Sequence, residues 1–497
     1  MEILTFEPTP EIERRLCFEA LPAAQQAIAE AYRRHIQQAM RVAPSGRGSV
    51  GLAIADPLNC LLATVAAYDL GHDVFLCDPQ WPQRNRLLRE IAPVSDAKDG
   101  DWDGGEWNEQ GEVAAIAPRN WAELADRANR EPYIAIPTGG TTGQRRFACH
   151  TWQTLTASAC GVRAAFQRDR LDSLCCLPTF HVSGLSQFVR AIVSGGRLAI
   201  ASPGSIRPDR SLPAADFSSF WLSLVPTQLQ RLLEVADWRD WLQQFDAIFL
   251  GGAPAWPELL DRARTEGLRL APTFGMTETA SQIATLHPDD FLAGRTGCGR
   301  ALPHAEIAIE PVGDDESRNG ETGDGKTGDG ETGKIGAIAI RAASLCHGYY
   351  DPATDMARPL TTERYWRSDD LGYLDRSGIL HVIGRASQKL ISGGENVYPE
   401  AVEAAIRATG LVADVAVCGL PDREWGQVLA AVYVLPRASQ KDSSDPRALS
   451  RDVAAQIRDR LTSCLARYEI PKRWRQVAAL PRNDRGKLNR AALPRLF

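Results

Sequence analysis

The sequence lacks several features that mark specialised classes of protein. It has no apolar stretch long enough to span a bilayer, and its first seven residues, MEILTFE, lack the basic and apolar regions of a secretion signal. Basic residues are not in excess, since 56 Lys and Arg stand against 62 Asp and Glu, a net charge of −6. This balance provides no positive field for a polyanion. We therefore expect a cytoplasmic protein that binds no nucleic acid and does not insert into membranes.

The cysteines show no pattern of pairing. The chain has 11 of them and no CxxC motif. Cys175 and Cys176 are the one close pair, and neighbouring side chains of a strand point to opposite faces of the sheet. We therefore expect reduced core thiols rather than disulfides or metal ligands.

What the chain does have is the composition of an ordinary globular protein. With 497 residues, 44% hydrophobic and 24% charged, it is long enough for two or more domains. Short apolar runs alternate with amphipathic segments, which predicts an α/β fold with parallel-rich sheets and flanking helices. The runs expected to be strands are residues 49–53, 73–76, 173–177, 197–201 and 247–250, and two of the expected helices are residues 58–70 and 226–238.

Residues 313–334 interrupt this pattern. They repeat a GDGxTG unit with almost no apolar residue, so they cannot bury enough surface to offset the entropy of ordering. We expect a disordered loop insertion. The alternative, a metal-binding acidic repeat, is disfavoured because the carboxylates lack a regular ligand spacing. Further β-structure is expected at residues 335–341 and 379–383.

The last part of the chain has the pattern of a small α+β domain. Residues 399–408 and 451–465 have helical periodicity, and residues 412–418 and 428–434 alternate as strands. We expect a large N-terminal domain, residues 1–383, and a small mobile C-terminal domain, residues 384–497. The segment 384–388 is a candidate hinge because its glycine and small residues can absorb a large dihedral change.

A glycine-rich segment, TGGTTGQRR at residues 138–146, follows an apolar run at residues 133–136. Glycines let backbone N–H groups approach an anion, while threonine hydroxyls and the two arginines add donors and charge. The spacing is not that of the P-loop, which requires GxxxxGK[ST]. The segment predicts a phosphate-binding loop at the end of a strand, with a mobile surface turn as the alternative.

Two further segments carry groups that suit a nucleotide. In TFGMTETAS, residues 273–281, Glu278 and Thr277 offer an oxygen ligand for Mg²⁺ and a hydroxyl for phosphate on an expected exposed loop. Phe274 stacks on a base or packs in the core. In YWRSDDLGYLD, residues 365–375, Asp370 either accepts two ribose hydroxyls or belongs to a turn-forming Asp pair.

Six motifs in this order resemble the acyl-adenylate-forming ligases, the superfamily of acyl-CoA synthetases, luciferases and peptide-synthetase adenylation domains. They are residues 138–146, LGGAPAW (250–256), TFGMTETAS, YWRSDDLG (365–372), GRASQKLISGGENVYPEAVE (384–403) and PRNDRGKLNR (481–490). The resemblance implies that ATP and a carboxylic acid give an acyl-adenylate and pyrophosphate, and that CoA thiol then attacks the adenylate. ATP, Mg²⁺ and coenzyme A are therefore the expected cofactor and substrates.

Within the superfamily, residues 177–192, 224–233 and 391–403 are similar to the 2-succinylbenzoate–CoA ligases of menaquinone and phylloquinone biosynthesis. This implies o-succinylbenzoate as the acid. The alternatives are a ligase for another acid, such as a benzoate or a fatty acid, a stand-alone adenylation domain serving a carrier protein, and a non-catalytic ATP-binding module. The sequence leaves the oligomeric state open, a homodimer included.

The resemblance also implies a role for individual residues. Lys487, Thr277 and Glu278 would be catalytic, and Glu278 would hold the metal. The acid would be bound by His181, Ser183, Arg190 and Arg231, although a core histidine and solvated helix faces are the alternatives. Nucleotide and CoA would be bound by Thr138, Gly139, Gly140, Thr141, Thr142, Gly143, Arg146, Gly251, Gly252, Ala253, Phe274, Gly275, Asp370, Arg385, Gly393 and Gly394.

The chain departs from the family pattern at three places. Arg145 and Arg146 stand where the loop usually ends in Pro-Lys, which keeps the charge but changes its geometry from a point to a fork. Ser387 matches the hinge position, often Asp or Lys. The usual Thr-Gly-Asp of the ribose motif is Ser368-Asp369-Asp370, which leaves Asp370 as the matching carboxylate.

Overall fold

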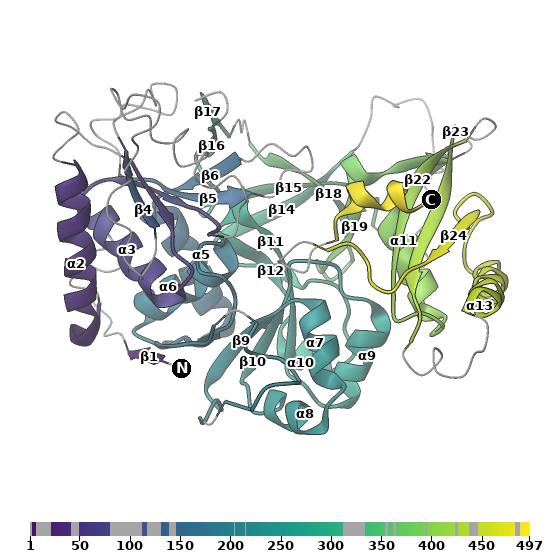
Figure 1. Ribbon diagram of the computed structural model, residues 1–497, viewed down its shortest axis with the longest axis horizontal. Coiled ribbons are helices and arrows are strands. Elements are labelled where there is room, and N and C mark those ends of the chain that lie inside the picture. Colours follow the sequence, from purple (N-terminus) through teal and green to yellow (C-terminus); the bar gives the residue numbers. More distant parts are fainter. Residues whose placement is uncertain are drawn as a thin grey trace.

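The computed structural model describes residues 2–5, 21–40, 49–79, 112–116, 131–138, 146–202, 204–213, 215–311, 333–352, 356–360, 364–392, 395–422, 426–436, 446–482 and 488–497. Figure 1 shows a large N-terminal body and a small C-terminal unit beside it, with the C-terminus on the small unit. Among the helices within those ranges, none combines the length and apolar character needed to cross a membrane.

The first sheet has seven strands in the order β17-β16-β6-β5-β3-β2-β4. Its parallel centre is β2, β3 and β5, and antiparallel strands flank it on both sides. The strands are β2 (Ser49–Ala53), β3 (Asp73–Leu76), β4 (Glu112–Ile116), β5 (Ile134–Thr138), β6 (Arg146–His150), β16 (Gly348–Asp351) and β17 (Met356–Pro359). Helix α3 (Pro57–Asp69) begins where the Asp56 carboxylate accepts a hydrogen bond from Asn59 N.

The second sheet has eight strands in the order β1-β8-β7-β9-β10-β11-β12-β13. Strands β7 to β11 are parallel to one another, and the strands at the two edges, β1, β12 and β13, pair antiparallel. The strands are β1 (Glu2–Thr5), β7 (Asp172–Cys175), β8 (Arg197–Ile200), β9 (Phe220–Leu224), β10 (Ala247–Leu250), β11 (Leu270–Met276), β12 (Ser281–Thr285) and β13 (Arg300–Ala301).

Helices fill the space between the sheets and cover the outer face of the second. One apolar cluster joins β2, β3 and β5 to β7 and β8 through α3, α5 (Trp152–Phe166) and α6 (Val182–Ser194). On the other face, α7 (Pro226–Leu233), α8 (Ala236–Leu242) and α9 (Pro257–Thr265) pack around a second cluster. Helix α2 (Ala23–Met40) packs on α3, and α10 (Pro288–Leu292) packs on β11.

A third sheet, antiparallel throughout, leads to the small unit. Its strands are β14 (Ala305–Glu310), β15 (Gly336–Ala342), β18 (Trp366–Leu374) and β19 (Leu380–Arg385). The expected strands at residues 335–341 and 379–383 are thus confirmed. The insertion predicted at residues 313–334 lies outside the described residues, apart from its last two.

The small unit has its own cores, made entirely of residues after Gln388. Its elements are β20 (Leu390–Ser392), β21 (Glu395–Val397), α11 (Pro399–Ala408), β22 (Asp414–Asp422), β23 (Gly426–Val434), α13 (Pro446–Leu461), β24 (Arg473–Gln476) and the 3₁₀ helix η5 (Arg490–Leu496). Another 3₁₀ turn, η4 (Ala386–Gln388), connects it to β19. The helix expected at residues 399–408 is confirmed at both ends.

Two expected elements differ from the structure. The single helix predicted at residues 226–238 is wrong, because the chain turns at Val235, whose backbone is extended, and starts a new helix. The Leu233 carbonyl left at the break accepts hydrogen bonds from Arg239 and Arg262. The strand predicted at residues 173–177 ends at Cys175, so Cys176 lies beyond it. All ten cysteines of the described ranges are free thiols, and Cys464 is the exposed one among them.

Candidate active site

The phosphate-loop motif joins two paired strands. Thr138 ends β5 and faces Arg146, the first residue of β6, with Thr138 Oγ1 3.4 Å from the Arg146 carbonyl. The prediction that the motif follows a strand is therefore confirmed. Its middle, Gly139, Gly140, Thr141, Thr142 and Gly143, lies outside the described residues.

Thr277 and Glu278 occupy a 3₁₀ turn, η3 (Thr277–Thr279), between β11 and β12. The expectation of an exposed loop here is wrong. Gly275 has a steric role, because a Cβ on it would lie 2.1 Å from the Ser281 carbonyl oxygen of β12. Ser281 has a φ of +110°, which costs a non-glycine residue about 1–3 kcal/mol. The tight return of the chain thus fixes the turn that presents Glu278.

His150 connects this turn to the phosphate-loop strands. Its Nε2 lies 2.8 Å from the Thr277 carbonyl oxygen, and its Nδ1 lies 3.0 Å from Thr154 Oγ1. Burial lowers the pKa of His150 to about 4, so the ring is neutral near pH 7. A carbonyl only accepts, so Nε2 donates to it and Nδ1 accepts from Thr154. The hydroxyl-bearing turn is in this way held against β6.

Glu278 lies among groups from three other strands. Tyr349 of β16 donates its hydroxyl to Glu278 Oε1 at 2.9 Å. Burial raises the pKa of Glu278, while the Tyr349 hydrogen bond and the charge of Arg385 oppose the rise and the charge of Asp370 adds to it. Burial and the Glu278 charge in turn raise the pKa of Tyr349, and Arg146 opposes this. Residues from four motifs therefore share one electrostatic environment.

Asp370 and Arg385 face each other across the third sheet. They are direct partners in the β18–β19 register, and Arg385 Nε lies 3.3 Å from Asp370 Oδ1. The alternative of a turn-forming Asp pair is wrong, because both aspartates lie within β18. Asp369 accepts hydrogen bonds from the backbone N–H, at 3.0 Å, and the hydroxyl of Ser387. Two of the departures from the family pattern thus contact each other at the candidate hinge.

The GGA segment follows directly after β10. A Cβ on Gly251 would lie 2.5 Å from Thr273 Oγ1, and Gly252 has a φ of +79°, a conformation that favours glycine. Phe274 is 8% exposed and packs in an apolar cluster with Ile283 and Leu380. Phe274 thus packs in the core, as one of the two alternatives expects, and its contact with a base stays a prediction.

The residues expected to bind the acid differ in exposure. His181 precedes α6 as its N-cap and is buried, whereas Ser183 in the first turn is half-buried. Arg190 is only 3% exposed, so the solvated-face alternative is wrong for it. Arg231 is exposed on α7, as the alternative of a solvated helix face expects. The structure thus separates the two arginines that the sequence treated alike.

Arg190 carries a buried charge that pairs with no carboxylate of the described residues. Its Nε donates to the Ser186 carbonyl at 3.0 Å and one Nη to Ser186 Oγ at 2.9 Å, while the other Nη has no partner within the described ranges. The guanidinium lies 5.3 Å from the ring centre of Phe249, in the strand that leads to the GGA segment. Burial lowers the Arg190 pKa to about 10, so the group stays charged at pH 7.

Metal ligands in the described ranges are few. No group of three or more His, Cys, Asp or Glu side chains there has the geometry to hold a metal ion. Mg²⁺ bound to a nucleotide needs only one or two protein carboxylates besides the phosphates, and Glu278 fits that need. Lys487, Gly393 and Gly394 lie outside the described residues.

His150 and Tyr349 are site residues that sequence reasoning missed. Neither belongs to a recognisable motif, and their contacts with the Thr277–Glu278 turn span 127 and 71 positions of the chain. The pairing of β16 with β6 and the hydrogen bond from Cys346 N to the Glu278 carbonyl bring Tyr349 to the turn. The one local signal is that His150 ends the strand that follows the phosphate loop.

Family models match both parts of the chain. The "AMP-binding enzyme" model matches residues 69–350, more than half of the chain, and the "AMP-binding enzyme C-terminal domain" model matches residues 401–487. The chain belongs to the AMP-binding enzyme family. The expected enzyme class, an AMP-forming acyl-CoA ligase, is confirmed with it.

Relatives in this family are similar over most of the chain. The 2-succinylbenzoate–CoA ligase of Geobacillus kaustophilus is 32% identical over 417 residues, which cover 83% of this chain and 78% of the relative. The o-succinylbenzoate CoA synthetase of Bacillus subtilis in complex with the acyl-adenylate intermediate OSB-AMP has a TM-score of 0.68 and 25% identity, over 94% of this chain and 92% of that one. Its complex with ATP and magnesium has a TM-score of 0.66 and 25% identity, over 94% of each chain.

Proposed function

We propose that this protein adenylates o-succinylbenzoate with ATP and transfers the acyl group to CoA, giving o-succinylbenzoyl-CoA, AMP and pyrophosphate. The observation that carries the choice of acid is the buried charge of Arg190, which pairs with no carboxylate in the part of the chain that the structure describes. o-Succinylbenzoate has two carboxylates, one of which is activated, so the other needs a cationic partner in the pocket. A monocarboxylic acid would leave the Arg190 charge uncompensated, which is costly in a buried site.

In the first step a carboxylate oxygen of the acid attacks the α-phosphorus of ATP, and the bond to pyrophosphate breaks. Negative charge must be neutralised at the acid and at all three phosphates. Lys487 bridges the acid and the α-phosphate, and the 138–146 loop holds the β- and γ-phosphates. Thr277 donates to an α-phosphate oxygen, and Glu278 would hold Mg²⁺, which would neutralise phosphate charge.

The nucleoside is held by the sheet ends around this turn. Asp370 accepts hydrogen bonds from the ribose hydroxyls, and Arg385 keeps its carboxylate oriented from the opposite strand. The backbone of Gly251, Gly252 and Ala253 lines the adenine slot, where the absence of side chains on the glycines lets a flat base approach. Phe274 packs in the core beside this region.

The acid lies beside the first turns of α6. His181 and Ser183 close the pocket over the succinyl chain, and Arg190 pairs with the carboxylate of the ring. The guanidinium offers a fork of donors that fits a carboxylate in two-point contact. Arg231 is assigned no contact with the acid, because its side chain is exposed.

In the second step the CoA thiol attacks the acyl carbonyl, AMP leaves, and the thiol proton passes to solvent. We place the domain boundary at residue 384 and the hinge at residues 384–388, with rotation bringing Gly393 and Gly394 to a pantetheine tunnel. The support is that the small unit has cores of its own and that η4 lies between it and β19. Ser387, within η4, is the pivot.

The free, mostly buried thiols accord with a reducing compartment, so we assign the protein to the cytoplasm. A homodimer is the assembly to test, by measuring its molar mass in solution. Its partners are small molecules, the acid, ATP and CoA.

A pyrophosphate-release assay over a panel of acids tests the proposal. With ATP and Mg²⁺, o-succinylbenzoate should release pyrophosphate, and CoA should then yield a thioester and AMP. Faster turnover of benzoate or of a long-chain acid would refute the substrate assignment while preserving the reaction class. Acyl transfer to a carrier protein but not to free CoA would indicate the stand-alone adenylation domain instead.

A further inference from the structure

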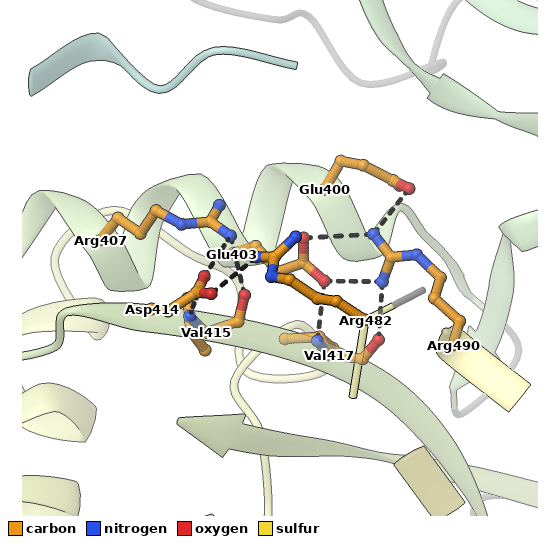
Figure 2. A network of polar contacts seen from close by, with 8 residues as sticks. All are labelled: Glu400, Glu403, Arg407, Asp414, Val415, Val417, Arg482 and Arg490. Atoms are coloured by element: carbon orange, nitrogen blue, oxygen red, sulfur yellow. Dashed lines mark hydrogen bonds and ion pairs between the residues drawn. The ribbon is translucent and has the colours of Figure 1, made fainter. Parts of the chain in front are cut away.

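A network of charged side chains lies at the base of the segment that carries Lys487. Figure 2 shows Arg490 between two glutamates of α11, with a second arginine, Arg482, beside Asp414 of β22. Arg490 donates to Glu403 Oε1 at 2.6 Å, to Glu403 Oε2 at 3.2 Å and to Glu400 Oε1 at 2.9 Å. It also donates to the Val417 carbonyl at 3.1 Å. All these contacts come from one guanidinium.

The network is largely shielded from water. The side chains of Arg490, Glu400 and Glu403 are 23%, 12% and 6% exposed. Glu403 is also anchored by the backbone, since its Oε1 accepts from Val417 N at 2.8 Å. Shielded, charge-assisted contacts of this kind hold a defined geometry, whereas exposed ion pairs contribute little.

Both ends of the segment that carries Lys487 are attached to the rest of the small unit. Arg482 and Leu488 form an isolated β-bridge, and Asn489 N donates to the Pro481 carbonyl at 2.8 Å. Arg482 pairs with Asp414 at 2.6 Å, and Arg490 pairs with α11. Lys487 directly precedes the bridged Leu488, so the residues that bound its segment are attached to α11 and β22.

The network also reaches the hinge strand. A Cβ on Gly384 would lie 2.8 Å from Glu400 Oε2, and that oxygen has no hydrogen-bond partner within the described ranges. Gly384 precedes Arg385, which faces Asp370, the residue whose carboxylate is proposed to bind the ribose. Glu400 thus lies against both Arg490 and the strand that bears Arg385, the partner of Asp370.

We propose that Arg490 is a positioning residue for adenylation: its pairing with Glu400 and Glu403 holds the Lys487 segment at the reach that the α-phosphate requires. This rests on the proposed function and on Lys487 as its adenylation lysine. Arg490 itself touches no substrate. The thioester step uses a different part of the small domain, so it does not need this placement.

The test is Arg490→Met, measured in single turnover for each half-reaction. Adenylation of o-succinylbenzoate should fall on the order of a hundredfold, the scale expected for misplacing a catalytic group by about 1 Å. Conversion of supplied o-succinylbenzoyl-adenylate to thioester should stay within about threefold of wild type. The matched control is Arg460→Met, which removes an arginine of the same domain that bonds the Thr409 carbonyl outside the network. It should leave both rates unchanged.

A purely structural role would lower both half-reactions together, and that result would overturn the proposal. So would unchanged adenylation in Arg490→Met. If this variant does not fold, Arg490→Lys decides, because it keeps the charge but cannot span both glutamates and the carbonyl. Arg490→Lys must then slow adenylation alone, by at least about fivefold, and any other result rejects the proposal. Wild-type protein that releases no pyrophosphate would refute the proposed function itself, which separates the two failures.

Discussion

Arg190 and Arg231 show how burial decides the role of a single residue. Arg190→Met should raise KM for o-succinylbenzoate, by the equivalent of about 2–5 kcal/mol, because the ring carboxylate would lose a desolvated partner. KM for ATP should stay nearly unchanged. Arg231→Met is the matched control and should alter neither constant, since its side chain is exposed. An unchanged KM for the acid in Arg190→Met would place recognition of the ring carboxylate elsewhere.

Tyr349 should control the pH dependence of adenylation through Glu278. The carboxylate must be ionised to hold Mg²⁺, and its pKa is raised by burial, so activity is lost as the pH falls through that raised pKa. The Tyr349 hydrogen bond lowers the pKa of Glu278. Tyr349→Phe should therefore shift the acid limb of the kcat/KM profile to higher pH.

The control for this shift is Tyr365→Phe. Tyr365 makes a comparable hydrogen bond to an exposed carboxylate, that of Glu306, so its removal should leave the acid limb where it is. An acid limb that does not move in Tyr349→Phe would show that ionisation of Glu278 does not limit the rate.

At the scale of elements, hydrophobic periodicity and the residues that end helices and strands predicted the regular parts of the fold well. The strands at residues 49–53, 73–76 and 247–250 and the helix at residues 399–408 have the expected ends, because apolar runs and flanking Gly, Pro and Asp determine them locally. The break at Val235 and the strand β18 were missed. Both depend on distant partners, the side chains that bond Leu233 in one case and the register with β15 and β19 in the other.

The candidate site likewise contains residues that the sequence identified and residues that it did not. Motif residues such as Asp370 and Arg385 were named from the sequence, and the structure makes them cross-strand partners. The exposure of Arg190 could not be predicted, because a helical pattern does not say which face a neighbouring strand covers. The same limit hid Tyr349, whose contact with Glu278 is set by strand order in the first sheet.

The β11–β12 hairpin yields a prediction at this scale. In Gly275→Ala the new Cβ would meet the Ser281 carbonyl and, at 2.5 Å, Gln282 Cα, and neither backbone atom can move without opening the hairpin. We expect a loss of about 1–3 kcal/mol in unfolding free energy and a drop in pyrophosphate release on the order of a hundredfold, because Thr277 and Glu278 would shift. Thermal melting and the release assay measure the two effects.

Gly71→Ala serves as the control for this variant. Gly71 has a φ of +82° with nothing within 4 Å of a new Cβ, so only backbone strain, about 1–2 kcal/mol, opposes the substitution. Its catalytic rate should be that of wild type. Full activity in Gly275→Ala would mean that the hairpin does not set the position of the turn.

At the scale of the whole molecule, specific contacts join the large and the small domain. Arg407 of α11 lies 5.3 Å from the ring centre of Trp256, which precedes α9 and ends the LGGAPAW motif. Asp369 of β18 accepts a hydrogen bond from Ser387 in the proposed hinge. Polar contacts of this kind suit an interface that forms and breaks during a catalytic cycle.

The last prediction concerns a change of domain orientation between the two half-reactions, and it tests them separately. In the proposed mechanism, Lys487 would reach the phosphates in one domain orientation and would leave when Gly393 and Gly394 move in to form the CoA tunnel. Lys487→Ala should therefore abolish adenylation but still convert supplied acyl-adenylate to thioester. Gly394→Trp should do the reverse, because a bulky side chain would block the narrow pantetheine path. Single-turnover rates of each half-reaction in both variants provide the measurement. Equal loss of both steps in Lys487→Ala would mean that one domain orientation serves the entire reaction.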